Sequence, residues 1–326
     1  MVISLFILLC SVRKIFAINS LTMIQNRLMV QIIIVLSLFF CFAGTSCGDT
    51  KKPGTSTSET MKQKDSTIGY VNSNGIKIYY EIHGSGRPLV LIHGGGSTIH
   101  TTFGSVLPLF AKHHKVIAVE LQAHGHTADR NIPSSFEQDA EDVAAVLKEL
   151  KVDSADIFGF SNGGNTAMQL AIRHPSLVRR LIVASSFYKR KGFDDQFWTF
   201  MKDASLENMP QQLQDAYLAI NPDRKGLIAM HNRDRDRMLQ FKDWPDESIR
   251  SIRMPTLILS GDHDVVRPEH QVEMFRLLPK GKLVILPGLH GEYIGEITTP
   301  KPTDERLRLT VDMIEDFLDA PMTTTS

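Results

Sequence analysis

A serine between glycines is the first residue whose type and setting could support chemistry. Ser161 stands in the segment 159–164, GFSNGG, with an apolar run before it at 155–160 and an amphipathic run after it at 166–174. This pattern predicts a sharp strand-to-helix turn that exposes the serine hydroxyl, as in a nucleophile elbow. A serine hydroxyl is a weak nucleophile at neutral pH, so such a site needs a base to accept its proton.

A base and a carboxylate follow later in the chain. His290 lies after an apolar run, and it can take the serine proton and later return it to the leaving group. A carboxylate must orient the imidazole and stabilise its protonated form. The segment 261–264, GDHD, follows another apolar run and offers both Asp262 and Asp264 for this role.

A glycine-rich segment comes before the serine. Residues 93–96, HGGG, follow the apolar run 88–92. A tetrahedral intermediate needs backbone N–H donors at its oxyanion. The N–H of Asn162, directly after the nucleophile, is one expected donor. The N–H of Gly95 is the second, because glycine lets the backbone approach a substrate closely. His93 is expected to support this loop structurally.

The elements that position these segments alternate between strands and helices. Residues 68–71 and 76–82 alternate apolar and polar side chains around NSNG at 72–75, which predicts a β-hairpin. The alternation that follows implies a mostly parallel sheet with helices on both faces. Ligands of such sheets bind beyond the carboxyl ends of the strands, where the chemical segments lie. The other expected strands are 88–92, 115–119, 155–160, 180–184, 256–260 and 282–286, and the expected helices are 103–112, 136–150, 166–174, 269–278 and 305–318.

Residues 185–251 break this alternation. No strand pattern is present there, and aromatic and methionine residues punctuate charged helical segments. We expect a helical insertion. Its aromatic and methionine side chains form either its own core or the lining of an apolar pocket.

Taken together, these elements resemble the α/β-hydrolase superfamily, in its single-domain esterase, lactonase and cofactor-free haloperoxidase-like branch. The chain order Ser, Asp, His is the order of that family's triad. The resemblance implies an α/β fold with a helical cap at 185–251 between core segments 67–184 and 252–318, and it implies no metal and no cofactor. Family spacing favours Asp264 over Asp262 as the acid. The matching elements are residues 93–95, the Gly125-containing turn at 122–127, the serine segment, residues 261–264 with Pro268, and His290.

Composition narrows the function classes. The 326 residues are 42% hydrophobic and 22% charged with zero formal net charge, so nothing points to a nucleic-acid partner. The three cysteines, Cys10, Cys41 and Cys47, all precede the globular part, which excludes a disulfide framework or a cysteine nucleophile there. His124 and His126 lie two residues apart and could be metal ligands, but the side chains of such close loop residues rarely point toward one ion.

The amino-terminal part predicts export. Residues 1–46 hold basic residues, apolar runs and then small residues, the layout of a secretory signal. Residues 44–47, GTSC, resemble the lipobox of bacterial lipoproteins, with Gly44 in place of the usual leucine, so Cys47 is the expected lipidation site. Residues 47–66 then form a flexible tether, and 319–326 a disordered tail. This predicts a lipoprotein anchored to the membrane of a bacterial cell envelope.

The expected activity is hydrolysis of a carboxylic ester or lactone through an acyl-enzyme, with a macrolide-type lactone as a narrower option. A carbon–carbon bond hydrolase or a cofactor-free perhydrolase keeps the same triad and stays open. Haloalkane dehalogenases and epoxide hydrolases of this fold use Asp at the nucleophile position, so Ser161 argues against both activities. A non-catalytic ligand-binding lipoprotein is the alternative from another class. The substrate's acyl and alcohol groups and the oligomeric state stay open.

Overall fold

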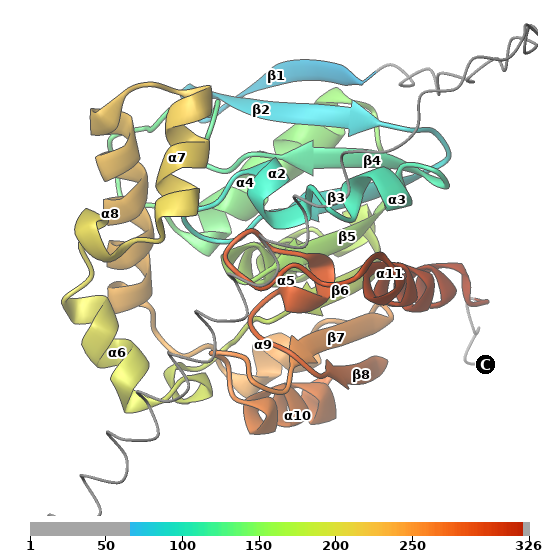
Figure 1. Ribbon diagram of the computed structural model, residues 1–326. Coiled ribbons are helices and arrows are strands. Elements are labelled where there is room, and N and C mark those ends of the chain that lie inside the picture. The colour runs from blue at the N-terminus through green and yellow to red at the C-terminus, as the bar shows by residue number, and fades with distance from the viewer. Residues whose placement is uncertain (1–65, 322–326) are drawn as a thin grey trace, which may run out of the picture. The chain divides into compact units, whose positions relative to one another are not determined.

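The central element of the molecule is an eight-stranded sheet (Figure 1). The computed structural model describes residues 66–321. The strand order is β1-β2-β4-β3-β5-β6-β7-β8. The first hairpin and the β2–β4 pair are antiparallel, and every other neighbouring pair is parallel. The strands are β1 (Thr67–Ser73), β2 (Ile76–His83), β3 (Arg87–Ile92), β4 (His114–Val119), β5 (Ala155–Phe160), β6 (Val178–Ala184), β7 (Thr256–Gly261) and β8 (Gly281–Leu286).

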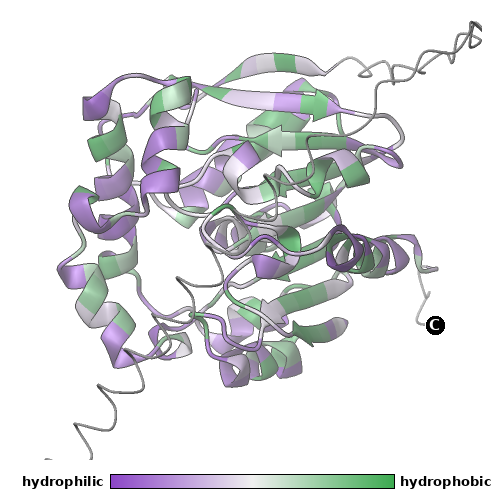
Figure 2. Ribbon diagram, viewed as in Figure 1, coloured by the Kyte–Doolittle hydropathy of each residue, from purple (hydrophilic) through white to green (hydrophobic). Residues whose placement is uncertain are grey.

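Helices cover both faces of this sheet. Successive side chains of a strand point to opposite faces, so each buried strand feeds two cores. Along β3, Val90 and Ile92 pack in the core under α4, α5 and α10, whereas Leu89 and Leu91 pack under α2, α3 and α11. Figure 2 shows the apolar colour concentrated in the central strands and the hydrophilic colour on the outer helix faces. These helices are α2 (Ile99–Phe103), α3 (Leu107–Phe110), α4 (Phe136–Glu149), α5 (Asn162–Arg173), α10 (Pro268–Leu277) and α11 (Asp304–Asp319).

The predicted α/β architecture is confirmed, and all eight predicted strands are present. One predicted helix, at 103–112, is wrong. The chain instead forms α2, which ends at its C-cap Gly104, and the separate one-turn helix α3. Pro108 lies in the first turn of α3, where its missing N–H costs nothing, but it cannot continue a helix from the preceding segment.

The insertion between β6 and β7 is helical, as predicted. It contains α6 (Asp195–Lys202), α7 (Gln211–Ile220), α8 (Arg224–Gln240) and α9 (Asp246–Arg250). The first three lie together beyond the carboxyl ends of the parallel strands (Figure 1), whereas α9 packs against α5 and α10 of the core.

The amino-terminal predictions concern residues outside 66–321. The signal at 1–46, Cys47 and nearly all of the tether to residue 66 lie outside the described residues, as do residues 322–326 of the predicted tail. At the other end of the chain, α11 continues to Asp319. Within residues 66–321, no helix has the length and apolar character needed to cross a membrane.

Candidate active site

Ser161 lies at a strained turn between β5 and α5. Its φ of 54° and ψ of −122° place a non-glycine residue in a region that L-residues rarely adopt. The N–H of Ser161 donates to the carbonyl of Ala184 at 2.8 Å, which ties the turn to the end of β6. The turn therefore has the predicted elbow geometry, with the serine side chain facing a pocket.

The neighbouring glycines allow this turn to form. A Cβ on Gly159 would lie 2.1 Å from the carbonyl oxygen of Gly163. A Cβ on Gly163 would lie 2.2 Å from the carbonyl oxygen of Ile92. Real Cβ atoms do not approach backbone so closely, so both positions require glycine. The spacing of the motif thus follows from close contact of the elbow with itself and with β3.

His290 faces the serine hydroxyl. Its Nε2 lies 3.1 Å from Ser161 Oγ, and its Nδ1 lies 2.7 Å from Asp264 Oδ1. Because an ionised carboxylate only accepts hydrogen bonds, Nδ1 carries the hydrogen and Nε2 is free to accept the serine proton. The ring packs against Phe160, with the ring centroids 4.8 Å apart. The three predicted triad residues therefore meet in the order that general-base catalysis requires.

Asp264 is a buried carboxylate held by several donors. Its Oδ1 also accepts from the N–H of Val266 at 3.1 Å. Its Oδ2 accepts from the hydroxyls of Ser185 and Ser260. Burial alone favours the protonated acid, but His290 and these hydrogen bonds outweigh it and lower the pKa of Asp264 to about 2. Asp264 is therefore ionised at neutral pH.

Opposing effects set the pKa of His290. Burial disfavours the imidazolium, but the charge and hydrogen bond of Asp264 outweigh it, and the buried Glu296 adds to them. The net effect raises the pKa of His290 above its ordinary value of 6.5. A protonated His290 is thus stabilised, as a base that receives the serine proton must be.

The glycine turn lies beside the elbow. A Cβ on Gly94 would lie 3.4 Å from Ser161 Cβ, and a Cβ on Gly95 would lie 2.4 Å from Asn162 Nδ2. Within the described residues, neither the Gly95 N–H nor the Asn162 N–H donates to a protein acceptor. Asn162 opens α5, where the first N–H groups have no partner within the helix. Both predicted donors are therefore available at the serine.

His93 supports this turn, as expected from the sequence. Its Nδ1 donates to the carbonyl of Gly94 at 2.7 Å, and its Nε2 accepts the N–H of Leu121 at 3.1 Å. One nitrogen must donate and the other must accept, so the ring is neutral. Burial agrees with this state, because it lowers the pKa of His93 to about 3.

A cavity of about 310 Å³ lies between the insertion and the strand ends, with Ser161 and His290 in its wall. Its lining is mainly apolar. The sequence left open which aromatic and methionine side chains of the insertion would line a pocket. Trp198, Met230, Phe241 and Trp244 pack in hydrophobic cores instead. The insertion's aromatic and methionine side chains that line the cavity are Phe187, Phe193, Phe197, Phe200, Met201, Met209 and Met238.

The other singled-out polar residues lie elsewhere. Asp262, the alternative acid, is partly exposed and accepts from the N–H of Gly288 at 2.8 Å. His263 is exposed beside it. His124 and His126 point to different partners, Asp234 at 2.9 Å and Glu120 at 2.9 Å, so the two rings do not converge on one point.

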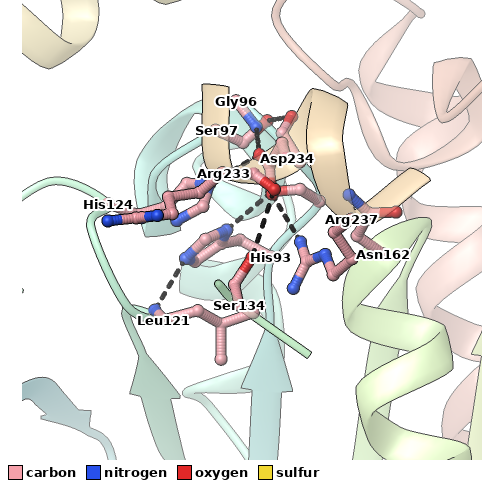
Figure 3. A network of polar contacts seen from close by, with 12 residues as sticks. His93, Gly96, Ser97, Leu121, His124, Ser134, Asn162, Arg233, Asp234 and Arg237 are labelled. Atoms are coloured by element: carbon pink, nitrogen blue, oxygen red, sulfur yellow. Dashed lines mark hydrogen bonds and ion pairs between the residues drawn. The ribbon is translucent and has the colours of Figure 1, made fainter. Parts of the chain in front are cut away.

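Several residues around the site were missed from the sequence. Ser185 directly follows β6, so its position at a strand end was an available signal. Tyr293 bonds Ser185, and Glu296 lies near His290, but no local pattern marks either residue. Asp234 sits in the charged run 233–237, RDRDR, which resembles a solvated helix face. Its carboxylate is nevertheless buried against the glycine turn (Figure 3).

The sheet order, the elbow at the end of β5 and the glycine turn at the end of β3 together define an α/β hydrolase. The chain belongs to the α/β-hydrolase superfamily, since the model of the alpha/beta hydrolase fold matches residues 87–239 and its relatives and structural neighbours are hydrolases of this superfamily.

The chain is similar to several hydrolases. The chain is 28% identical over 288 residues to 2-hydroxy-6-oxo-2,4-heptadienoate hydrolase of Pseudomonas putida, covering 80% of this chain and 99% of that protein. It is 28% identical over 250 residues to the human serine hydrolase BPHL, covering 70% of this chain and 81% of that protein. The fold is similar to that of a meta-cleavage product hydrolase from Pseudomonas fluorescens, with a TM-score of 0.64, 21% identity, and coverage of 78% of this chain and 99% of that one.

Proposed function

We propose that this α/β hydrolase cleaves a carboxylic ester or lactone through an acyl-enzyme on Ser161. The observation that carries the proposal is the continuous chain from Ser161 Oγ to His290 Nε2 at 3.1 Å and from His290 Nδ1 to Asp264 at 2.7 Å. The N–H groups of Gly95 and Asn162 are the proposed oxyanion donors.

The proposed reaction has two stages. In the first stage Ser161 attacks the ester carbonyl while His290 accepts the serine proton, and the protonated His290 then gives that proton to the leaving alcohol. In the second stage His290 takes a proton from water as the water attacks the acyl-enzyme, and it returns this proton to Ser161 as the acid is released. The largely apolar cavity supports a substrate with a hydrophobic acyl or alcohol group. A macrocyclic lactone is one such substrate.

Carbon–carbon bond hydrolysis is the second candidate. The P. putida relative is named for a 2-hydroxy-6-oxo-dienoate, and it aligns over 80% of this chain. The same triad serves both activities, so a substrate panel must separate them. Turnover of p-nitrophenyl esters or lactones supports the first proposal. Turnover of a 2-hydroxy-6-oxo-dienoate without ester cleavage supports the second.

Labelling by a fluorophosphonate tests for catalysis as opposed to ligand binding. The probe reacts only with a serine activated by an aligned base and oxyanion hole. We expect the wild-type protein to label and Ser161→Ala to remain unlabelled. An unreactive wild-type protein would favour the non-catalytic binding alternative.

The pH profile tests the base. Only neutral His290 can accept the serine proton, so kcat/KM for an ester should rise as pH rises through the pKa of His290. Because Asp264 and Glu296 raise this pKa, the midpoint of the rise in kcat/KM is expected above pH 6.5. A profile that falls with pH over this range contradicts the assignment of His290.

Membrane attachment through Cys47 is also a proposal. It concerns residues outside the described part and depends on the sequence GTSC at 44–47. Palmitate labelling in a bacterial host should mark the wild-type protein and not Cys47→Ala. Equal labelling of the two proteins contradicts lipidation at this cysteine.

A further inference from the structure

A carboxylate from the insertion binds the glycine turn. Asp234 lies on α8, and its Oδ2 accepts the N–H of Gly96 at 2.6 Å and Nε2–H of His124 at 2.9 Å (Figure 3). Its Oδ1 accepts from Arg237 Nη2 at 2.5 Å. Asp234 is only 8% exposed, so these contacts are made away from solvent. An acid from the insertion therefore reaches the turn that holds a proposed oxyanion donor.

The hydrogen bonds fix the charge state of this cluster. His124 Nδ1 lies 2.8 Å from the carbonyl oxygen of Gln122, and Nε2 faces the Asp234 carboxylate. Both nitrogens face acceptors, so both carry hydrogen and the ring is an imidazolium. Burial opposes this charge, but Asp234 outweighs it and raises the pKa of His124. Asp234 is ionised, which makes its bond to the Gly96 N–H a charge-assisted one.

The two peptides that flank the Cα of Gly95 are thus held by different parts of the molecule. The Gly94 carbonyl accepts from His93 of the core, and in a trans peptide the Gly95 N–H points the opposite way. The next peptide is held at its N–H by Asp234 of the insertion at 2.6 Å and, through a longer bond, at its carbonyl by Ser97 Oγ at 3.3 Å. Gly95 has no side chain to restrict its dihedral angles, so its orientation depends on the hydrogen bonds that hold the two flanking peptides.

We propose that Asp234 is a positioning residue for the oxyanion hole. Its carboxylate supplies the short hydrogen bond that holds the peptide after Gly95 at its N–H, in addition to the longer bond from Ser97 at the carbonyl. This inference rests on the proposed serine-hydrolase function. The same helix lines the cavity with Asp234 itself and with His231, Arg235 and Met238, so one rigid element contacts both the substrate space and the oxyanion turn. Contact of a substrate with α8 is thereby coupled to stabilisation of the transition state.

A second ion pair anchors the same helix without touching the turn. Arg233, the residue before Asp234, bonds Asp129 of the core at 2.9 Å through Nη2. This pair offers a matched control, because its removal weakens docking of α8 but leaves the acceptor of the Gly96 N–H in place.

The test compares kcat and KM of the full chain for p-nitrophenyl butyrate in Asp234→Ala, Asp234→Asn and Arg233→Ala. Asp234→Ala removes the acceptor, and kcat is expected to fall about 100-fold with KM changed by less than about threefold. Asp234→Asn keeps an oxygen for the Gly96 N–H and should retain kcat within about fivefold. Arg233→Ala should behave as the wild type. The rate of fluorophosphonate labelling should follow kcat, because the phosphonyl oxygen accepts hydrogen bonds from the same proposed oxyanion donors.

The outcomes separate this inference from the proposed function. A folded Asp234→Ala variant with wild-type kcat overturns the positioning role, and so does an equal loss in Arg233→Ala, which would indicate docking of α8 alone. If Asp234→Ala does not fold, the double variant Asp234→Ala/His124→Gln removes the acid together with the buried cation that pairs with it and carries the same prediction. A wild-type protein without Ser161-dependent turnover contradicts the proposed function instead.

Discussion

Replacing Ser161 with alanine is expected to lower kcat for a p-nitrophenyl ester by about a million-fold. The small remaining rate enhancement would come from substrate binding and the oxyanion donors alone. The physical reason is that the substitution removes the attacking hydroxyl, whose Oγ lies 3.1 Å from His290 Nε2. The measurement is a steady-state assay on purified protein, with the fluorophosphonate-blocked wild type defining the background.

The fold should survive this change. The Ser161 side chain makes no capping hydrogen bond to α5, so alanine removes no helix contact. Ser161→Gly provides an internal check. At a φ of 54° and a ψ of −122° glycine relieves backbone strain, which typically amounts to about 1–3 kcal/mol. We therefore expect Ser161→Gly to be inactive but to have a higher Tm than Ser161→Ala. Substantial ester turnover in either variant would refute the nucleophile assignment.

Replacing Asp264 with asparagine is expected to lower kcat by roughly 10⁴-fold while leaving the site's shape intact. The carboxylate accepts on both oxygens, from His290 and Val266 at one and from Ser185 and Ser260 at the other. An asparagine NH₂ must face one of these donor sets. Where it faces His290, it favours the tautomer with hydrogen on Nε2, which cannot accept the serine proton.

Asp262→Asn is the matched control for this prediction. It makes the same chemical change two residues away, on a side chain that is partly exposed and contacts the loop backbone at Gly288. Its kcat is expected to stay within about threefold of the wild type, as for most surface changes. A large loss in Asp262→Asn with little loss in Asp264→Asn would reverse the two roles.

The pH profile of any residual Asp264→Asn activity should also change. The rise in activity with pH should move to lower pH, because the charge that raises the pKa of His290 is gone.

The sequence by itself determined the fold class and the proposed triad. Strands and helices were predictable because burial of one face makes apolar residues recur every two residues in a strand and every 3.6 residues in a helix. This periodicity can be read from a short stretch of sequence. The elbow was predictable for a similar reason, since its glycines lie within a few residues of Ser161. The prediction of one helix at 103–112 was wrong because two local signals conflicted. The helical spacing of apolar residues continues across Gly104 and Pro108, but a single helix cannot continue through these two residues.

Only the tertiary structure decided which groups face each other. Asp262 and Asp264 follow the same strand, and the direction of each side chain separates the residue that bonds His290 from the one that bonds the loop backbone. Asp234 and Gly96 are separated by 138 residues, and the charged run around Asp234 has the composition of a solvated helix face. Composition reports the average environment of a segment, whereas a hydrogen bond depends on where two distant segments are brought together by the packing of α8 against the strand ends.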